Sequence, residues 1–421
     1  MGNFAIQNNS NSRIELQSYF QKHALYPPFV QKLPPADLDL IVVIPAFNEP
    51  ELVHAVQSIL SCQRNDICIE IIVVLNYPDS QPNLQSFHEF QRKELLGLNV
   101  DNANEILDLP VFSLPVKDAG VGLARKIGMD EACYRFESIN KNGIILCFDA
   151  DCSCHPDYLK LVVDGFKNMP NQNALTIGFK HRLQDLTESN LEAIIQYELH
   201  LRTYIGWQKF YKYPMAFQTL GSCMAVRSKA YQQQGGMNKR KAGEDFYFLH
   251  KYSVLSQLAE LRPLLVYPSS RISDRVPFGT GKAVRDIINS KSQHMSYNPK
   301  GIASYCDFYN LLCDSWPLIE GGRSWKSLTN SIALTSYLMQ VNFEEALIEN
   351  IKNSTTAKVF ASRMGRFLNP FRLMKFLHAA SETEFPEIPV LDSAKQLLIA
   401  NHGKPLKQPS SLIELLENMQ V

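Results

Sequence analysis

Gly143-Ile-Ile-Leu-Cys-Phe-Asp-Ala-Asp151 is the stretch of sequence that decides the fold. Its apolar run, 144–148, follows a glycine and predicts a buried strand of a parallel sheet. Asp149 and Asp151 come directly after this run, and in an extended chain their spacing points both carboxylates to one side. Ligands of α/β proteins bind at the carboxyl ends of such strands, where paired carboxylates suit Mg²⁺ or Mn²⁺ held with a phosphate. The alternative is that the two acids only cap the helix that begins near Pro156.

The composition is that of a globular protein with balanced charge. The 421 residues can bury a full core and allow two or three domains. With 42 basic and 42 acidic residues, no nucleic-acid partner is expected. The first thirty residues are polar, which predicts no secretory signal, and no apolar run reaches the roughly 18 residues of a membrane helix. Nine scattered cysteines predict reduced core thiols and a cytoplasmic location.

Strands and helices alternate along the first half of the chain. Apolar runs at 38–44, stopped by Pro45, and at 69–75 predict two more buried strands, and helices are expected over 50–60, 86–96 and 123–134. This order predicts an α/β fold, a Rossmann-like and mostly parallel sheet flanked by helices. Residues 1–37 form an N-terminal lead-in with a short helix at 14–23.

Four ordered motifs carry a resemblance to a known family. They are Ile-Pro-Ala-Phe-Asn-Glu (44–49), Gly-Val-Gly-Leu-Ala-Arg-Lys-Ile-Gly (120–128), Asp-Ala-Asp (149–151) and Gly-Glu-Asp-Phe-Tyr-Phe (243–248), the last after a predicted strand at 219–226. In sequence and order they resemble the signature stretches of family 2 glycosyltransferases of the GT-A fold. The resemblance covers residues 38–260 and implies an enzyme that uses a nucleotide-sugar donor.

The resemblance also implies roles for individual residues of the donor site. Asp151 matches a ligand of the metal, Mn²⁺ or Mg²⁺, and Asp149 matches a contact to the metal or to the donor's ribose. The positions that it assigns to donor binding are Pro45, Glu49, Asn76, Asp118, Arg125 and Asp149. Many members carry an acid that touches the base where this chain has Asn76, so the donor is left open between a UDP-sugar and a GDP-sugar.

Asp245 is the candidate general base, with Glu244 beside it. A carboxylate at a helix N-terminus is expected to stay ionised near neutral pH, because the helix dipole favours the charged form. It could then take the proton of an acceptor hydroxyl, which predicts inversion by a single displacement. The alternative is that both acids only cap an amphipathic helix.

Two basic segments lie close to these motifs in the sequence. Lys239-Arg-Lys241 could hold phosphate groups, although such runs are more often solvated surface. In the segment 270–282, the resemblance suggests that Asp274 completes the metal shell and that Arg275 and Lys282 pair with phosphate. The alternative for this segment is a turn whose charged residues pair with one another.

The remaining chain predicts helices without a chemical signature. We expect a catalytic domain at 38–282 and an α-helical region at 283–421, the latter with helices at 302–313, 325–339, 343–351, 357–377, 392–399 and 412–419. An acceptor site is expected from loops around 180–218 and from these helices, with a glycan, a lipid or a small molecule as the acceptor. The basic residues between Arg363 and Lys375 allow peripheral contact with an anionic membrane, and ordinary helix packing is the alternative.

Three other functions remain open from the sequence. A retaining GT-A glycosyltransferase of the glycosyl-glycerate type would share the fold and the first acidic motif. A nucleotidyltransferase is disfavoured, because Pro45-Ala-Phe-Asn-Glu49 replaces the glycine- and arginine-rich loop of that class. A catalytically silent nucleotide-binding scaffold is disfavoured by the presence of both acidic motifs.

Overall fold

The computed structural model describes residues 19–64, 66–98, 106–241, 243–272, 279–290, 293–402 and 411–419. The chain forms two compact units. Unit 1 comprises Met1–Arg182, Thr219–Tyr252 and Ser256–Ser269, and unit 2 comprises Leu183–Gln218, Ser253–Leu255 and Ser270–Val421. Of the lead-in helix expected at 14–23, residues 19–22 are helical and 14–18 lie outside the described residues.

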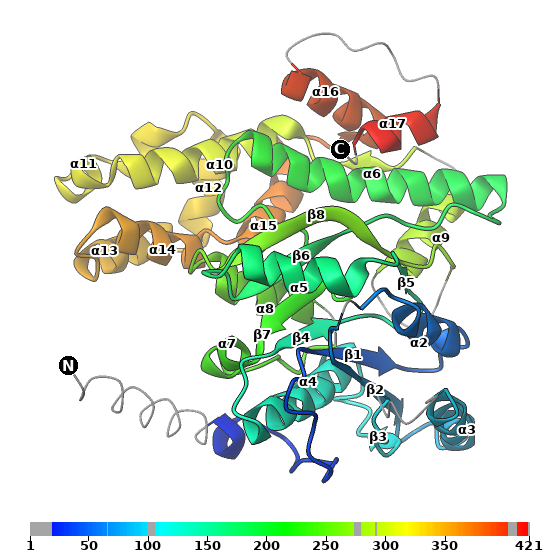
Figure 1. The fold of residues 1–421 in the computed structure, drawn as a ribbon. Helices are drawn as coiled ribbons and strands as arrows, with labels where there is room; N and C mark the ends of the chain where they lie inside the picture. Colours follow the sequence, from blue (N-terminus) through cyan, green and yellow to red (C-terminus); the bar gives the residue numbers. More distant parts are fainter. Residues whose placement is uncertain are drawn as a thin grey trace, which may run out of the picture. The chain divides into compact units, whose positions relative to one another are not determined.

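Unit 1 is built on an eight-stranded sheet with the order β3-β2-β1-β4-β7-β6-β8-β5 (Figure 1). The strands are β1 (Leu40–Ala46), β2 (Ile69–Pro78), β3 (Phe112–Leu114), β4 (Ile144–Cys147), β5 (Ser153–Cys154), β6 (Ala174–Phe179), β7 (Met224–Arg227) and β8 (Leu258–Tyr267). The helices of this unit are α2 (Leu52–Leu60), α3 (Leu84–Leu96), α4 (Val121–Ser138), α5 (Tyr158–Asn168), α7 (Ser228–Gln233) and α8 (Glu244–Ser253). The structure thus confirms the predicted α/β class with helices flanking a large sheet.

The strand β1 lies at the centre of the parallel part of the sheet. It pairs in parallel with β2 on one side and with β4 on the other, and all seven of its residues are buried. Burial on both faces explains why this strand reads as a continuous apolar run. The expected stop at Pro45 was wrong, because Pro45 pairs with Val74 in register and the strand continues to Ala46.

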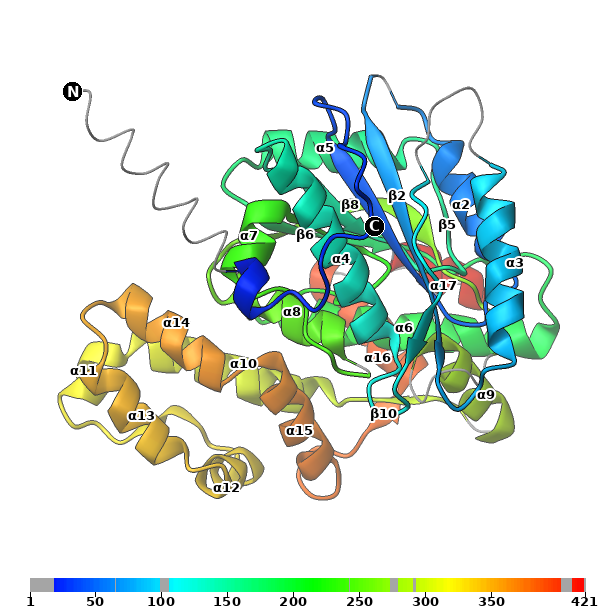
Figure 2. The same ribbon diagram turned by 90° about the horizontal axis from the view of Figure 1, so that it is seen from below.

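The rest of the sheet is mixed and was less visible in the sequence. β7 runs antiparallel to both β4 and β6, and β5 runs antiparallel to β8. The strand predicted at 219–226 is confined to Met224–Arg227. β4 and α4 lie where they were predicted, and Figure 2 shows α4 along β1 and β2, with which it makes its main contacts.

Unit 2 is helical, as predicted for the C-terminal region. Its elements are α6 (Glu188–Phe210), α9 (Thr280–Ser290), β9 (Met295–Ser296), α10 (Pro299–Asp314), α11 (Trp316–Glu320), η1 (Trp325–Leu328), α12 (Ile332–Gln340), α13 (Phe343–Lys352), α14 (Ala357–Phe367), α15 (Pro370–Ser381), β10 (Ile388–Pro389), α16 (Val390–His402) and α17 (Leu412–Asn418). The single helix expected at 357–377 is two helices, because Pro370 begins the second one. Similarly, the helix expected at 325–339 is divided into η1 and α12.

The segment 180–218 differs most from expectation. Its centre is the 23-residue helix α6 rather than a set of loops. Thr187 caps this helix by accepting a hydrogen bond from the Asn190 amide at 3.3 Å. Unit 2 therefore includes a long helix that precedes, in the sequence, the last strands of unit 1.

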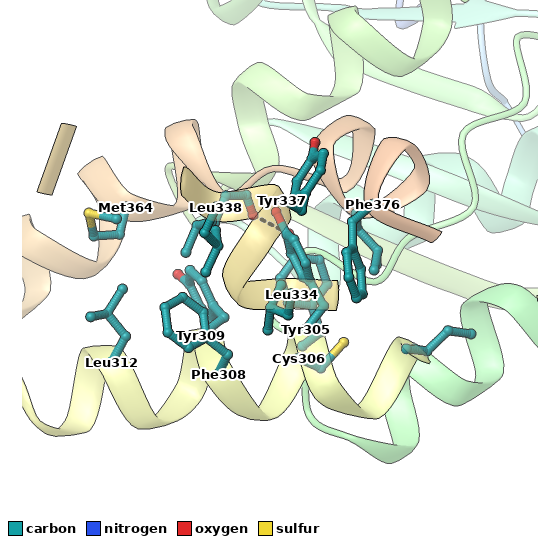
Figure 3. Packing of buried hydrophobic residues seen from close by; sticks show 14 of the residues in the cluster. Tyr305, Cys306, Phe308, Tyr309, Leu312, Leu334, Tyr337, Leu338, Met364 and Phe376 are labelled. Carbon is teal, nitrogen blue, oxygen red and sulfur yellow. Dashed lines mark hydrogen bonds between the residues drawn. The ribbon is translucent and has the colours of Figure 1, made fainter. Parts of the chain in front are cut away.

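An aromatic core holds the helices of unit 2 together. Tyr305, Phe308 and Tyr309 of α10 point toward Leu334, Tyr337 and Leu338 of α12, and Phe376 of α15 packs on the same cluster (Figure 3). The Phe376 ring stacks on Tyr305 with a centroid separation of 5.8 Å. No helix among those described has both the length and the apolar composition to cross a membrane.

Candidate active site

The first acidic motif lies at the carboxyl end of the central strands. β4 ends at Cys147, and Phe148 leads directly into Asp149. Its parallel neighbour β1 ends at Ala46, shortly before Glu49, so both motifs emerge from the same edge of the sheet. This is the edge at which α/β folds bind ligands.

Arg125 joins the two acidic motifs. Its guanidinium is fully buried at the start of α4, with a side-chain exposure of 1%. Nη2 donates to Asp149 Oδ1 at 2.6 Å, and Nη1 donates to Glu244 Oε1. Burial disfavours the charged form, but the charges of Asp149 and Glu244 outweigh it and raise the pKa of Arg125 above its usual value. The guanidinium is therefore a permanent cation held between two carboxylates.

Two glycines make room for this cation and for the start of α8. A Cβ on Gly221 would lie 2.5 Å from Arg125 Nη2, and a Cβ on Gly122 would overlap the carbonyl oxygen of Arg240. Close approach of these backbones therefore requires glycine at both positions. Gly122 belongs to the Gly-Val-Gly motif, whereas Gly221 was expected only to lie in a predicted strand.

Asp245 is half-buried in the first turn of α8, and its Oδ1 accepts a hydrogen bond from the Phe246 amide at 2.7 Å. Burial and the adjacent Glu244 raise the pKa of Asp245 to about 7, while Arg125 and the amide act in the opposite direction. The expectation of a fully ionised carboxylate near neutral pH was therefore wrong, because desolvation exceeds the helix-terminus effect. A carboxyl group that titrates near neutrality suits a general base.

Asp151 is half-buried on the loop after β4. Its carbonyl oxygen accepts from Arg182 Nη2 at 3.0 Å, and the same nitrogen lies 2.9 Å from Glu51 Oε2. Across the described ranges, no group of three or more His, Cys, Asp or Glu side chains is arranged to hold a metal ion. The first acidic motif contributes the carboxylates of Asp149 and Asp151 to this region. Two hard oxygen ligands fit Mg²⁺ or Mn²⁺ when diphosphate oxygens and water complete the shell.

The other predicted donor residues occupy different environments. Glu49 is buried, and its Oε1 accepts from the Glu51 amide at 2.9 Å. Asn76 is also buried, and its Nδ2 donates to the Ala46 carbonyl at 3.0 Å, which joins β2 to β1. Asp118 is half-exposed in the loop before α4. With Pro45 inside β1, all four lie in unit 1, and their contacts with a nucleoside stay predictions.

The structure describes all of the basic segment 239–241 and part of the segment 270–282. Lys241 Nζ donates to the Val116 carbonyl at 2.7 Å, and the Arg240 guanidinium stacks 4.0 Å from the Tyr247 ring centroid. Asp274 and Arg275 lie outside the described residues. Lys282 lies in α9 of unit 2, where its Nζ is 2.5 Å from Asp286 Oδ2 on the surface.

One known protein family matches part of the chain. Residues 41–233 match the profile of the family described as glycosyl transferase family 2. Arg125, Asp149 and Asp151 lie inside the matched segment, whereas Glu244 and Asp245 follow it. Residues 41–233 are therefore similar to family 2 glycosyltransferase domains, and this match indicates a glycosyltransferase. No curated protein sequence matches the chain.

Solved structures give only distant likenesses. One is S. aureus TarS 1–349 in complex with UDP-GlcNAc, with 14% identity, coverage of 91% of this chain and 90% of that chain, and a TM-score of 0.37. Another is the mannosyltransferase PcManGT from Pyrobaculum calidifontis in complex with GDP-Man and Mn²⁺, with 13% identity, coverage of 90% and 96%, and a TM-score of 0.36. At such scores these likenesses carry no argument about the present chain.

Proposed function

We propose that this protein transfers a sugar from a nucleotide-sugar donor, a UDP- or GDP-sugar, to an acceptor hydroxyl with inversion, and that it requires Mn²⁺ or Mg²⁺. One observation carries the proposal. Within a family 2 glycosyltransferase domain, the buried Arg125 contacts both Asp149 of the first acidic motif and Glu244 of the second. The two acidic motifs therefore belong to a single charge network, and Glu244 is the immediate neighbour of the candidate base Asp245.

In this scheme the donor binds at the carboxyl end of β1 and β4. Asp151 and Asp149 would hold the ion together with the donor's diphosphate, and the bound ion would supply charge stabilisation for the departing nucleoside diphosphate. Pro45, Glu49, Asn76 and Asp118 remain the candidates for nucleoside contacts. Because the resemblance matches Asp151 to the metal ligand, Asp151 is the principal ligand in this proposal. One oxygen of Asp149 accepts from Arg125.

Arg125 acts as a positioning residue rather than as a donor ligand. Both ends of its guanidinium are engaged by carboxylates, and its side chain is almost fully buried. Contact with a diphosphate would break one of these buried ion pairs, at a cost of roughly 3–5 kcal/mol. Its role is to fix Asp149 and Glu244, and through Glu244 the first turn of α8.

Asp245 receives the acceptor proton. As the acceptor oxygen forms its bond to the anomeric carbon, the bond to the diphosphate oxygen breaks and Asp245 takes the hydroxyl proton. Only the ionised carboxylate can do this, and a pKa of about 7 leaves a useful ionised fraction at neutral pH. Attack from the face opposite the leaving group inverts the anomeric centre, and a product with retained configuration would reject this role.

The remaining elements of the proposal concern the whole chain. We assign catalysis to residues 38–282 and acceptor selection to the helical region 283–421. Nine free thiols support a reducing, cytoplasmic environment. Arg363, Arg366, Arg372 and Lys375 on α14 and α15 support peripheral contact with an anionic membrane, which co-sedimentation with phosphatidylglycerol vesicles would test.

The proposal is tested by thermal unfolding with UDP, GDP and their sugars, each with and without Mn²⁺. A ligand that binds the folded state raises the midpoint by mass action. We expect one base to raise the midpoint in a metal-dependent way, and we expect Asp151→Ala to abolish that shift. Asp164→Ala on α5 is the matched control and keeps it. If no nucleotide shifted the midpoint with any metal, the chain would be a silent scaffold and the proposal would fail.

A further inference from the structure

Two thiols lie close together, and one of them follows the first acidic motif by three residues. Cys62 follows α2, and Cys154 ends β5, 92 positions further along the chain. Their Sγ atoms are 3.5 Å apart. All nine cysteines of the chain are free thiols, and both members of this pair belong to unit 1. The transfer reaction proposed above uses neither of them.

One serine holds both sulfur atoms in place. Ser58 Oγ accepts from the Cys154 amide at 2.8 Å and lies 3.2 Å from Cys154 Sγ. The Ser58 carbonyl oxygen accepts from Cys62 Sγ at 3.5 Å and from Cys154 Sγ at 3.6 Å. These contacts come from the last turns of α2 and fix the pair before any bond forms. The pair is therefore preorganised for a reaction between its two sulfur atoms.

The two thiols differ in their acidity. The hydrogen bond from Cys154 lowers the pKa of Cys62, against the opposing effect of burial, and the charge of Arg64 acts in the same direction as the hydrogen bond. The pKa of Cys154 is raised by the same hydrogen bond and by burial. Cys62 therefore forms a thiolate more readily than Cys154 does. The thiolate is the nucleophilic species in sulfur chemistry.

We propose that Cys62 and Cys154 form a reversible disulfide when the protein reacts with hydrogen peroxide. The Cys62 thiolate attacks one peroxide oxygen, the O–O bond breaks, and the sulfur becomes a sulfenic acid while hydroxide leaves and is protonated to water. Cys154 then gives up its proton, its sulfur attacks the Cys62 sulfur, and the S–S bond forms as the S–O bond breaks and a second water leaves. Both thiols are oxidised by one peroxide, and a small dithiol reverses the reaction.

A disulfide between Cys62 and Cys154 would restrain the segment that follows the first acidic motif. Cys154 is three residues after Asp151, and β5 pairs with β8 directly beyond the acidic loop. A disulfide would tie this segment covalently to the end of α2. The inference that the bond forms does not depend on the proposed function, because its detection requires neither donor nor acceptor.

Peptide mapping of the full chain tests the proposal. Reduced protein is treated with hydrogen peroxide, free thiols are alkylated, and the digest is examined by mass spectrometry with and without dithiothreitol. We expect a linked peptide pair containing Cys62 and Cys154, lighter by two hydrogen atoms than the separate peptides and cleaved by dithiothreitol. Alkylation of both residues at the level of untreated protein, or links confined to other cysteines, would overturn the proposal.

Variants distinguish this pair from general thiol oxidation. Cys154→Ser should lose the link and accumulate a Cys62 sulfenic acid that dimedone traps. Cys68→Ser is the matched control, because Cys68 is half-exposed, has a pKa raised to about 11 by burial and nearby carboxylates, and should leave the link intact. Loss of the link in Cys68→Ser would also contradict the proposal. If Cys154→Ser fails to fold, the wild-type map alone decides.

Discussion

The two units of this molecule bury different kinds of side chain. Of the described residues, the buried charged ones in unit 1 are Glu49, Glu70, Arg125, Lys126, Asp130, Glu131, Arg135 and Glu244, whereas unit 2 buries Glu198 alone. The core of unit 2 is instead a cluster of aromatic and aliphatic side chains around Phe308, Phe343 and Phe376.

This difference supports the proposal that the chemistry takes place in unit 1. Burying a charge is expensive unless it is paired or hydrogen-bonded. In unit 1, Arg125 pairs with Asp149 and Glu244, and Arg135 pairs with Glu70. Glu131 instead accepts hydrogen bonds from the backbone amides of Phe29 and Val30. Some of these pairs hold the fold together, and the network around Arg125 reaches the half-exposed carboxylates of the site. The core of unit 2 is instead stabilised by apolar packing.

The largest effect is expected from removing the cation of the network. Arg125→Met leaves Asp149 and Glu244 without their common partner, and should lower the free energy of unfolding by about 3–5 kcal/mol. Denaturant unfolding measures this change. Arg92→Met is the matched control, because Arg92 pairs with Asp108 on the surface and should cost about 0–1 kcal/mol. Equal losses of unfolding free energy in the two variants would show that the buried network stabilises the fold no more than a surface ion pair does.

Asp245→Asn should change the transfer rate and the stability in opposite directions. Without the base, transfer should fall by about 10²–10⁴-fold, and the wild-type rate should rise with pH through a pKa of about 7. Because that pKa lies above the usual value of 3.8, the folded protein binds the proton more tightly than the unfolded chain does. Stability from this group is therefore lost as pH rises from about 4 to about 7.

Measurements at pH 8 check both consequences. At this pH the asparagine variant should have the higher melting temperature and the lower transfer rate. Glu192→Gln, which changes a carboxylate on α6, should leave both quantities unchanged. A transfer rate that is independent of pH between 5 and 8 in the wild type would contradict the role of Asp245.

Phe343→Ala tests the apolar half of the comparison. Phe343 is fully buried, with ring centroids 5.0 Å from Trp325 and 5.5 Å from Phe308. The cavity left by its removal should lower the free energy of unfolding by about 3–5 kcal/mol, with no dependence on salt or pH. Ile348→Ala on the same helix is the control, since this side chain is 62% exposed. Calorimetry at two salt concentrations checks the result.

A smaller effect is expected from crowding Arg125. Gly221→Ala places a methyl group 2.5 Å from Nη2, so the guanidinium must shift, at a cost of about 1–3 kcal/mol. Gly321→Ala is the control, because its added Cβ would be 3.4 Å from the nearest atom and its φ is −74°. Full stability of Gly221→Ala would mean that Arg125 is not fixed by this contact.

The sequence predicted the central elements of unit 1 because their signals are local. The apolar run before Asp149 specified β4, and the acidic pair before an apolar face specified α8. The pairing of Arg125 with Glu244 could not be predicted, since these residues are 119 positions apart and only the fold brings them together. The raised pKa of Asp245 has the same origin, because burial depends on the complete packing.

The elements that the sequence missed lack a simple pattern. The helix α6 carries apolar residues on several sides because it packs against α9, α10, α16 and α17. Its sequence therefore shows no single apolar face. β8 is partly exposed and carries Arg262 and Pro263, and its pairing with β6 is irregular at Gly178. By contrast, the breaks that divide the single helices expected at 357–377 and 325–339 carry local signals, which are Pro370 and the capping residue Ser331.

The central claim is that the acidic network of unit 1 is a donor-cleaving site. The most direct measurement is the release of nucleoside diphosphate from the donor that stabilises the protein, in wild type, Asp151→Ala and Asp164→Ala, with Mn²⁺ present. We predict release by wild type and by Asp164→Ala, and a loss of at least about 10²-fold in Asp151→Ala. Release by Asp151→Ala at the wild-type rate would contradict the account.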